Sequence, residues 1–177
     1  MCGQPGGFST NLAYRSDNAQ ETAAATALQA ALARVGIKVT LKGSSTADYY
    51  SSAAGSTAYV HSHDIGIAAG LWQGDWPDGY GFLDSLTAGN AISPDSNTNI
   101  AEENDPVVNN LFVQSTTATG AARTAIWSQI DQQVMKDAAI LPGIYAKTVL
   151  YRPAKLTNVY VQAFYGMYNY AVLGLSS

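Results

Sequence analysis

The amino-acid sequence predicts an α/β domain in which a central mixed sheet is flanked by helices. Three observations support this fold class: a strand, a helix and a second strand follow one another within residues 10–41, a short apolar run occupies 64–69, and two helical patterns fill 105–136. Strand, helix and strand at this spacing form a βαβ unit, whose strands are parallel and whose crossover is right-handed. A chain of 177 residues fits a single domain with a substantial core.

The βαβ unit begins with a loosely alternating strand at residues 10–14. The helix after it is the clearest element of the sequence and should span 19–35, because its apolar residues recur with a helical period. Asp17 or Asn18 can begin this helix in a capping box, and Gly36 can end it in a left-handed conformation. The apolar positions are Ala24, Ala27, Leu28, Ala31, Leu32 and Val35.

The next stretch of the chain alternates short elements with polar connections. Residues 37–41 alternate apolar and polar side chains, as a half-buried strand does. The Ser, Ala and Tyr-rich stretch after them contains one expected short helix at 46–54. Residues 64–69 are an apolar run between a polar cluster and a glycine, which predicts a short buried strand. One or two turns of helix are expected at 80–86.

The second half of the chain begins with a long Asn, Ser and Asp-rich loop at 87–104. Asp105 as a cap and Pro106 in the first turn predict a helix at 105–117. An apolar residue at every fourth position predicts another helix at 121–136. Two strand-like segments follow at 139–152 and 156–163, and the aromatic tail at 165–175 should pack on another part of the chain.

The composition excludes several classes of function. A net charge of −4 without any cluster of Lys and Arg argues against nucleic-acid binding. No apolar run approaches the roughly 18 residues that a membrane span needs. Cys2 is the single cysteine, which excludes an internal disulfide. The N-terminus lacks the pattern of a leader peptide, and we interpret Met1-Cys2-Gly3 as an artificial or truncated start.

Residues 71–84, LWQGDWPDGYGFLD, are the most unusual stretch, because tryptophans and carboxylates stand between glycines and a proline. Pro77 and Gly79 prevent a regular element, so the motif is a turn that follows the strand at 64–69. Ligands of open α/β sheets bind at the carboxyl ends of strands. The candidate ligand-binding residues are Trp72, Gln73, Asp75 and Trp76.

The two aspartates of this motif invite different interpretations. Asp75 follows Gly74, which lets a ligand approach the backbone, and a carboxylate beside two indole rings suits a cation. A loop-capping role is the alternative. Asp78 follows Pro77 and is placed to close its own turn, which favours a structural role.

An enzymatic function is the second hypothesis. Asp75 and Asp78 could form the acid and base pair of a small hydrolase, which would require a separation of about 5 to 9 Å and a raised pKa on one carboxyl group. The sequence contains no nucleophile elbow, P-loop or dinucleotide-binding fingerprint, so catalytic residues and cofactors are not expected. His61, His63 and Asp64 could lie on one side of an extended chain and bind a metal, but no further ligands are evident.

Three segments together resemble the extracellular solute-binding proteins of ABC importers, solute-binding family 5, the peptide- and nickel-binding type. Residues 34–41, RVGIKVTL, are similar to a helix of that family that runs into a G-I-x-V strand. Residues 72–78 match its W-x-G-D-aromatic-x-D pattern, and residues 123–142 resemble its late helix. Gly79 stands where the family most often has proline, and residues 90–104 lack an aromatic-plus-Asn signature.

The resemblance implies that residues 1–177 are one domain, the second lobe of a two-lobed, type II periplasmic-binding-protein-like receptor. Such a receptor captures peptides or other amine-bearing solutes outside the cytoplasm and delivers them to ABC permease subunits. The implied role of Asp75 is to pair with the α-ammonium of the ligand, while Trp72 and Gln73 offer backbone hydrogen bonds. The first and last strands should lie side by side, because an inserted lobe is entered and left through one hinge.

Overall fold

A computed structural model describes residues 6–147 and 149–176, and the interpretation of Met1-Cys2-Gly3 therefore lies outside the described residues. The sheet contains β1 (Phe8–Arg15), β2 (Ile37–Ser44) and β3 (Ile65–Ala68) in the order β2-β1-β3. Both pairs are parallel, so this sheet lacks the mixed strand directions expected from the sequence, although the α/β class is confirmed.

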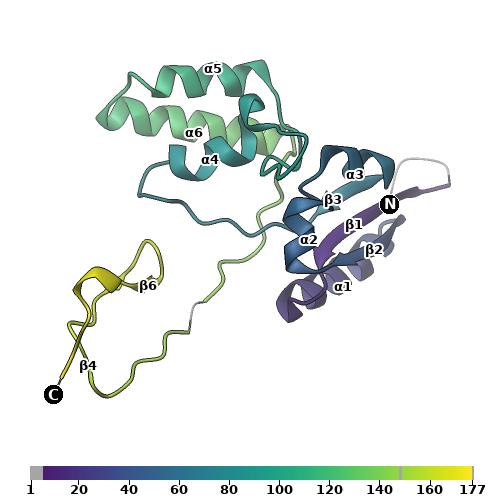
Figure 1. The fold of residues 1–177 in the computed structure, drawn as a ribbon. Helices are drawn as coiled ribbons and strands as arrows, with labels where there is room; N and C mark the ends of the chain where they lie inside the picture. The colour runs from purple at the N-terminus through teal and green to yellow at the C-terminus, as the bar shows by residue number, and fades with distance from the viewer. Residues whose placement is uncertain (1–5, 148, 177) are drawn as a thin grey trace.

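The βαβ unit is confirmed, with helix α1 (Ala19–Ala33) as the crossover between β1 and β2 (Figure 1). The Asn18 side chain caps α1 by accepting hydrogen bonds from the backbone N–H groups of Gln20 and Glu21. The helix ends before the predicted residue 35 because the chain turns into Gly36, whose φ is +87°. Gly36 thus provides the left-handed residue that leads into β2.

The two faces of the sheet are covered by different helices. Leu12 points to α1 and packs with Ala25 and Val39, whereas its neighbour Ala13 points to the opposite face, where it packs with Tyr49 and Ala54. Successive residues of a strand face opposite sides, so β1 is buried from both sides.

The second face is covered by α2 (Thr46–Ser51) and α3 (Thr57–Ser62) instead of one helix at 46–54. The chain turns so tightly at Gly55 that a Cβ there would lie 1.9 Å from the carbonyl oxygen of Tyr50. The Ser56 hydroxyl then caps α3 by accepting from the backbone N–H of Tyr59. This cap is a sequence signal that the sequence analysis overlooked.

A separate helical layer follows the sheet (Figure 1). It consists of α4 (Tyr80–Thr87), the short 3₁₀ helix η1 (Gly89–Ala91), α5 (Pro106–Ser115) and α6 (Gly120–Lys136), which confirms the helices expected near 80–86, 105–117 and 121–136. Its apolar core is a cluster of buried residues from α5, α6 and the turn after α4, and partly buried residues of α4 pack against it. The buried members are Ala88, Val108, Leu111, Phe112, Ile130 and Val134.

Residues 138–176, here called the C-terminal arm, leave the helical layer as an extended chain (Figure 1). The described residues within 139–152 form neither strand nor helix, so the strand predicted there is wrong. Beyond them the arm forms two antiparallel strand pairs, β4–β7 and β5–β6. The elements of the arm are β4 (Leu156–Thr157), β5 (Val161–Gln162), β6 (Met167–Tyr168), η2 (Tyr170–Val172) and β7 (Gly174–Leu175).

Two further expectations for the C-terminal arm are wrong. The last strand, β7, pairs with β4 and not with β1. The predicted continuous strand at 156–163 is divided into β4 and β5, which belong to different pairs. Across the described parts of the chain, no helix combines the length and the apolar character that crossing a bilayer requires.

Candidate functional site

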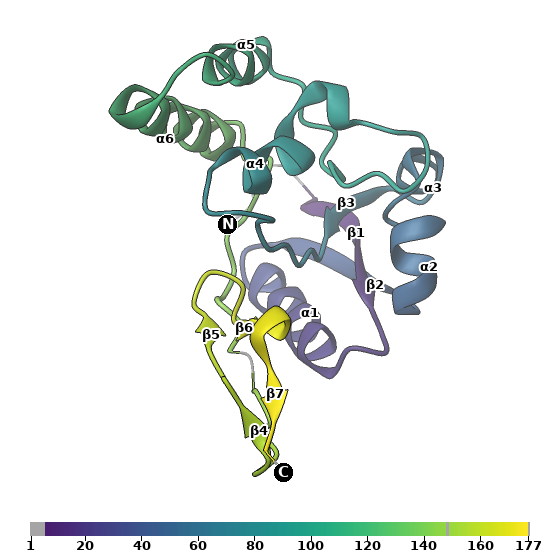
Figure 2. The same cartoon turned by 60° about the vertical axis from the view of Figure 1, so that its left-hand side comes forward.

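The motif loop, residues 71–79, connects the end of β3 to the beginning of α4 and so joins the sheet to the helical layer (Figure 2). Parallel strands end together at one edge of a sheet, which is where ligands of such sheets bind. The position predicted for the motif, directly after a short strand, is confirmed.

Asp78 fastens the C-terminal end of the motif loop to the helical layer. Its Oδ1 accepts a hydrogen bond from the backbone N–H of Tyr80 at 2.9 Å. The guanidinium of Arg123 on α6 donates from Nε to Oδ2 at 2.8 Å and from Nη2 to Oδ1 at 2.9 Å. These bonds to Arg123 hold the pKa of the Asp78 carboxyl below its usual range. The predicted structural role of Asp78 in its own turn is confirmed.

Arg123 connects three parts of the helical layer at once. Besides the pair with Asp78, its Nη1 donates to the carbonyl oxygen of Ser115 at the end of α5. The guanidinium carbon also lies 4.8 Å from the centre of the Trp127 ring, a cation–π distance. Arg123 is the first residue of the segment 123–142 that resembles the family's late helix, but the sequence alone did not indicate its role as the partner of Asp78.

Glycines make room for the tryptophans around this anchor. A Cβ on Gly79 would lie 2.5 Å from the Trp127 ring, and a Cβ on Gly81 would lie 3.2 Å from the Trp76 ring. Gly79, where the family most often has proline, is thus explained by the close packing of Trp127. Trp76 stacks on Tyr80 with ring centres 6.3 Å apart, yet 45% of Trp76 stays exposed.

The other candidate residues lie in the first half of the motif loop. Asp75 and Gln73 are exposed. Trp72 is half-buried, and its indole N–H is buried without a hydrogen-bond partner among residues 6–147 and 149–176. The Asp75 carboxylate likewise accepts no hydrogen bond from the described part of the chain. The loop therefore presents the Asp75 carboxylate to solvent, and tryptophans stand on either side of it in the sequence.

The first half of the motif loop also contacts the C-terminal arm, which sequence reasoning did not anticipate. The Tyr165 hydroxyl donates to the backbone carbonyl of Asp75 at 2.5 Å, and Gln73 Nε2 donates to the carbonyl oxygen of Phe164 at 3.3 Å. A Cβ on Gly74 would lie 3.0 Å from the Phe164 ring. The space beside Gly74 that the sequence analysis assigned to a ligand is therefore filled by Phe164.

The arrangement does not favour an acid and base pair. A general acid needs a carboxyl group whose pKa is raised, whereas Arg123 lowers the pKa of Asp78. Asp78 is committed to a structural ion pair while Asp75 faces solvent. The two carboxylates thus have different environments, and the Asp78 carboxylate, which is paired with Arg123, is unsuited to donate a proton.

The histidines do not form the arrangement considered for a metal site. His61 lies in α3 and not in an extended chain, and its Nε2 is 2.7 Å from Glu102 Oε1. The His63 ring stacks on Tyr59 with centres 3.9 Å apart. Among the residues that the structure describes, no group of three or more His, Cys, Asp or Glu could hold a metal ion.

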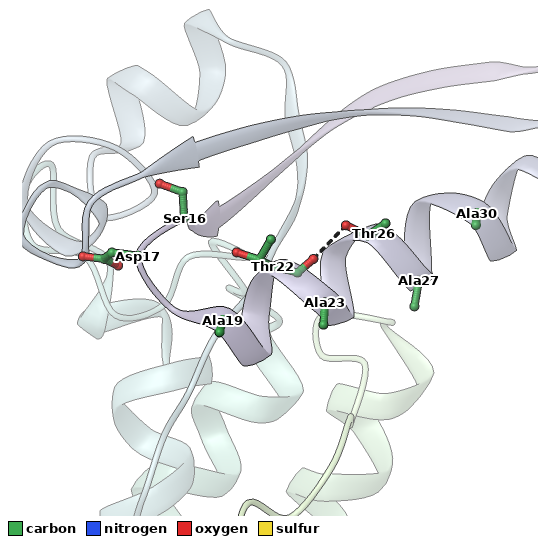
Figure 3. A pocket seen from close by; sticks show the side chains of 8 residues that line it. All are labelled: Ser16, Asp17, Ala19, Thr22, Ala23, Thr26, Ala27 and Ala30. Carbon is green, nitrogen blue, oxygen red and sulfur yellow. Dashed lines mark hydrogen bonds between the residues drawn. The ribbon is translucent and has the colours of Figure 1, made fainter.

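A groove of about 740 Å³, whose lining contains no residue of the motif loop, runs along α1 (Figure 3). Half of its lining is alanine, and most of its polar side chains are bonded within the chain: the Thr26 hydroxyl donates to the carbonyl oxygen of Thr22 at 2.8 Å, and Asp17 accepts from the backbone N–H of Thr46 at 2.8 Å. A groove open to solvent with so little to bind a ligand is a poor site. Its lining is Ser16, Asp17, Ala19, Thr22, Ala23, Thr26, Ala27 and Ala30.

Comparisons with known proteins agree with the resemblance found in the sequence. Residues 3–94 match the bacterial extracellular solute-binding proteins, family 5 (middle). No curated protein matches the chain. Among solved structures, the clavulanic acid biosynthesis oligopeptide binding protein 2 is similar over 98% of this chain and 31% of its own, with 35% identity and a TM-score of 0.90.

Two more solved structures share the fold at lower identity. DppA from Helicobacter pylori, an ABC transporter-associated periplasmic binding protein in complex with the peptide STSA, matches 77% of this chain and 25% of its own, with 24% identity and a TM-score of 0.64. The pheromone receptor PrgZ matches 96% of this chain and 30% of its own, with 17% identity and a TM-score of 0.65. The chain therefore spans about a third or less of the length of these proteins.

Proposed function

This chain belongs to family 5 of the bacterial extracellular solute-binding proteins, and from that premise we propose that it is one ligand-binding lobe of a two-lobed receptor that captures peptides or other amine-bearing solutes for import. The partners of the lobe are the first lobe of the same protein and the permease subunits of an ABC transporter. The receptor works outside the cytoplasm, at the cell surface or in the periplasm.

The observation that carries this proposal is the environment of Asp75. Its carboxylate is exposed on a loop whose far end is fixed by the pair between Asp78 and Arg123. The indoles of Trp72 and Trp76 stand on either side of it in the sequence. A carboxylate with nearby aromatic ring faces attracts an ammonium group by charge and by cation–π interaction. Asp75 therefore serves as the anchor for the α-ammonium of a peptide.

Trp72, Gln73 and Trp76 complete the proposed ligand site. Trp72 and Gln73 contribute backbone groups that pair with the main chain of a peptide, as added strands do. Trp76 contributes an exposed ring face. Binding needs no catalytic residue, which agrees with the relatives above being binding proteins.

One lobe alone is a weak binder on energetic grounds. A hydrogen bond to a charged group contributes about 1.5 to 3 kcal/mol, whereas a micromolar dissociation constant corresponds to about 8 kcal/mol. The remaining contacts, and the exclusion of water that strengthens the charged pair, come from closure against the first lobe.

Calorimetric titration with trialanine tests the proposal on two proteins, the 177-residue chain and a two-lobed protein that contains it. We expect micromolar or tighter binding by the two-lobed protein and no measurable binding by the chain alone. Panels of polyamines, sugars and divalent metal ions serve as controls. Submicromolar binding of trialanine to the chain alone would contradict the two-lobe proposal, and binding of a sugar or a metal in preference to every peptide and amine would contradict the ligand class.

A further inference from the structure

The C-terminal arm contacts the motif loop although about 90 residues separate the two in the sequence. The contacts come from the turn between β5 and β6, where Phe164 and Tyr165 lie. They are the hydrogen bond from the Tyr165 hydroxyl to the Asp75 carbonyl, the bond from Gln73 to the Phe164 carbonyl, and the packing of the Phe164 ring on Gly74. All three fall on residues 73–75.

We propose that Phe164 and Tyr165 are positioning residues of the ligand site, through which the C-terminal arm fixes the conformation of residues 73–75 and hence the direction of the Asp75 carboxylate. This inference rests on the proposed function for the role of Asp75 in binding. The contact itself is a property of this chain and can be tested without any ligand.

The motif loop has little else to hold its first half. The Ala69 N–H donates to the Ala13 carbonyl at 2.9 Å, and at the other end the Asp78 carboxylate is paired with Arg123. Between these points, the Tyr165 hydroxyl is the one hydrogen-bond partner that the described residues offer to the backbone of residues 70–75. Without it, the backbone of residues 70–75 would make no hydrogen bond within the described residues, and only the Gln73 side chain and the packing of Phe164 on Gly74 would connect it to the arm.

The identity of residue 74 supports the same conclusion. Gly74 is buried although Gln73 and Asp75 beside it are exposed, and the atom nearest to its missing side chain belongs to Phe164. A contact of 3.0 Å is tighter than most carbon–carbon contacts in proteins, so alanine at this position would require the Phe164 ring to shift by a few tenths of an ångström. Gly70 differs, because a Cβ there would meet no atom within 4 Å.

The chain offers a matched pair of substitutions for each contact. Tyr165→Phe removes only the hydroxyl that donates to Asp75, and Tyr168→Phe removes a hydroxyl on the same hairpin that makes no hydrogen bond within the described residues. Gly74→Ala displaces Phe164, whereas Gly70→Ala adds a methyl group in open space.

The decisive measurement is ¹⁵N relaxation of the 177-residue chain without ligand. We expect backbone order parameters for residues 73–75 near about 0.85 in the parent and in both controls, and below about 0.6 in Tyr165→Phe and Gly74→Ala. Order parameters in α5 and α6 should stay unchanged, which separates release of the loop from general unfolding. If Gly74→Ala unfolds the chain, the order parameters of Tyr165→Phe alone test whether the arm positions residues 73–75.

Unchanged order parameters at residues 73–75 in Tyr165→Phe would overturn the inference, as would an equal fall in Tyr168→Phe. In the two-lobed protein, Tyr165→Phe should weaken trialanine binding several-fold while Tyr168→Phe leaves it intact. If neither the parent nor any variant binds trialanine, the proposed function fails for that ligand, and the relaxation result still decides whether the arm positions the loop.

Discussion

The body of the molecule, residues 8–137, and the C-terminal arm place their apolar side chains in opposite environments. In the body, Val108 and Ile130 are fully buried. In the arm, Ile144 and Val149 are 85% and 94% exposed. The body thus contains its own apolar core, whereas the path of the arm is fixed by few contacts within this chain.

The two regions also differ in charge. All thirteen Asp and Glu residues lie before residue 138, whereas the arm holds Lys147, Arg152 and Lys155 and no acidic residue. Exposed apolar and cationic side chains on an extended segment suit a surface that another part of a longer protein covers. The similar structure of a much longer relative includes 98% of this chain, which supports that interpretation. Within this chain, the arm is held by the packing of Ala139 and Ile140 on the helical core and by its contacts with the motif loop.

The largest difference between body and arm should appear in the response to truncating a single isoleucine. Ile130→Ala leaves a cavity in a fully packed core and should lower the free energy of unfolding by about 2 to 5 kcal/mol. Ile144→Ala removes exposed atoms and should change it by about 0.5 kcal/mol or less. Urea denaturation measures both values. Similar losses for the two variants would mean that the arm is packed on the body in solution.

A smaller effect is expected from the anchor of the motif loop. Asp78→Asn keeps the shape of the side chain but removes its charge, and should lower the free energy of unfolding by roughly 1 to 2 kcal/mol, since hydrogen bonds to charged groups are strong but this pair is partly exposed to solvent. Urea denaturation at pH 7 measures the loss. A variant as stable as the parent would contradict the structural role of Asp78.

The same ion pair predicts a pH dependence. Because the folded-state pKa of Asp78 is lowered by Arg123, the stabilisation is fully present above the unfolded pKa of about 3.9 and is lost as the pH falls through the folded value. The difference in stability between the parent and Asp78→Asn should therefore shrink as the pH is lowered from about 5 toward the folded pKa. A difference that grows on acidification would have the wrong sign for this mechanism.

The smallest effect on stability should follow removal of most of the arm. Trypsin should cut first after Lys147 and Lys155, which are exposed on the extended segment, while Arg152 is protected by the proline that follows it. The remaining body should lose less than about 1 kcal/mol of stability, because its core ends before these sites. Mass spectrometry of early fragments and the melting temperature of the trimmed chain check this. First cuts within α1 or α6 would contradict it.

The sequence predicted most of the body because its signals there are local. The period of α1, the caps at Asn18 and Asp105 and the alternation of β2 depend on neighbours a few residues apart. A helix end at Gly55 was expected, but the earlier end of α2 at Ser51 and the separate helix α3 were missed. The tight turn between the two helices brings Gly55 against the backbone of Tyr50, a contact that the sequence pattern does not show.

The arm and half of the site could not be predicted, because their structure depends on residues that are far apart in the sequence. The composition of residues 139–152 favours a strand, but the described part of the chain offers these residues no strand to pair with. The motif loop and Asp78 were recognised from their own residues, but the contacts of Phe164 and Tyr165 with residues 73–75 join distant parts of the chain and leave no periodic signal. The preference of residue 74 for glycine was visible, yet its cause was assigned to a ligand.

The proposed role of Asp75 as the anchor for the ammonium group of a ligand can be tested by calorimetry on the two-lobed protein. Trialanine and N-acetyl-trialanine are titrated into the parent, Asp75→Asn and Asp78→Asn. We expect acetylation of the peptide to weaken binding to the parent by about 2 to 5 kcal/mol, the usual cost of removing one partner of a buried charged pair. Asp75→Asn should weaken trialanine binding by a similar amount and abolish the effect of acetylation. Asp78→Asn should bind trialanine as tightly as the parent and should still be weakened by acetylation. If Asp75→Asn binds trialanine as tightly as the parent, or if acetylation costs Asp75→Asn as much as it costs the parent, Asp75 is not the anchor.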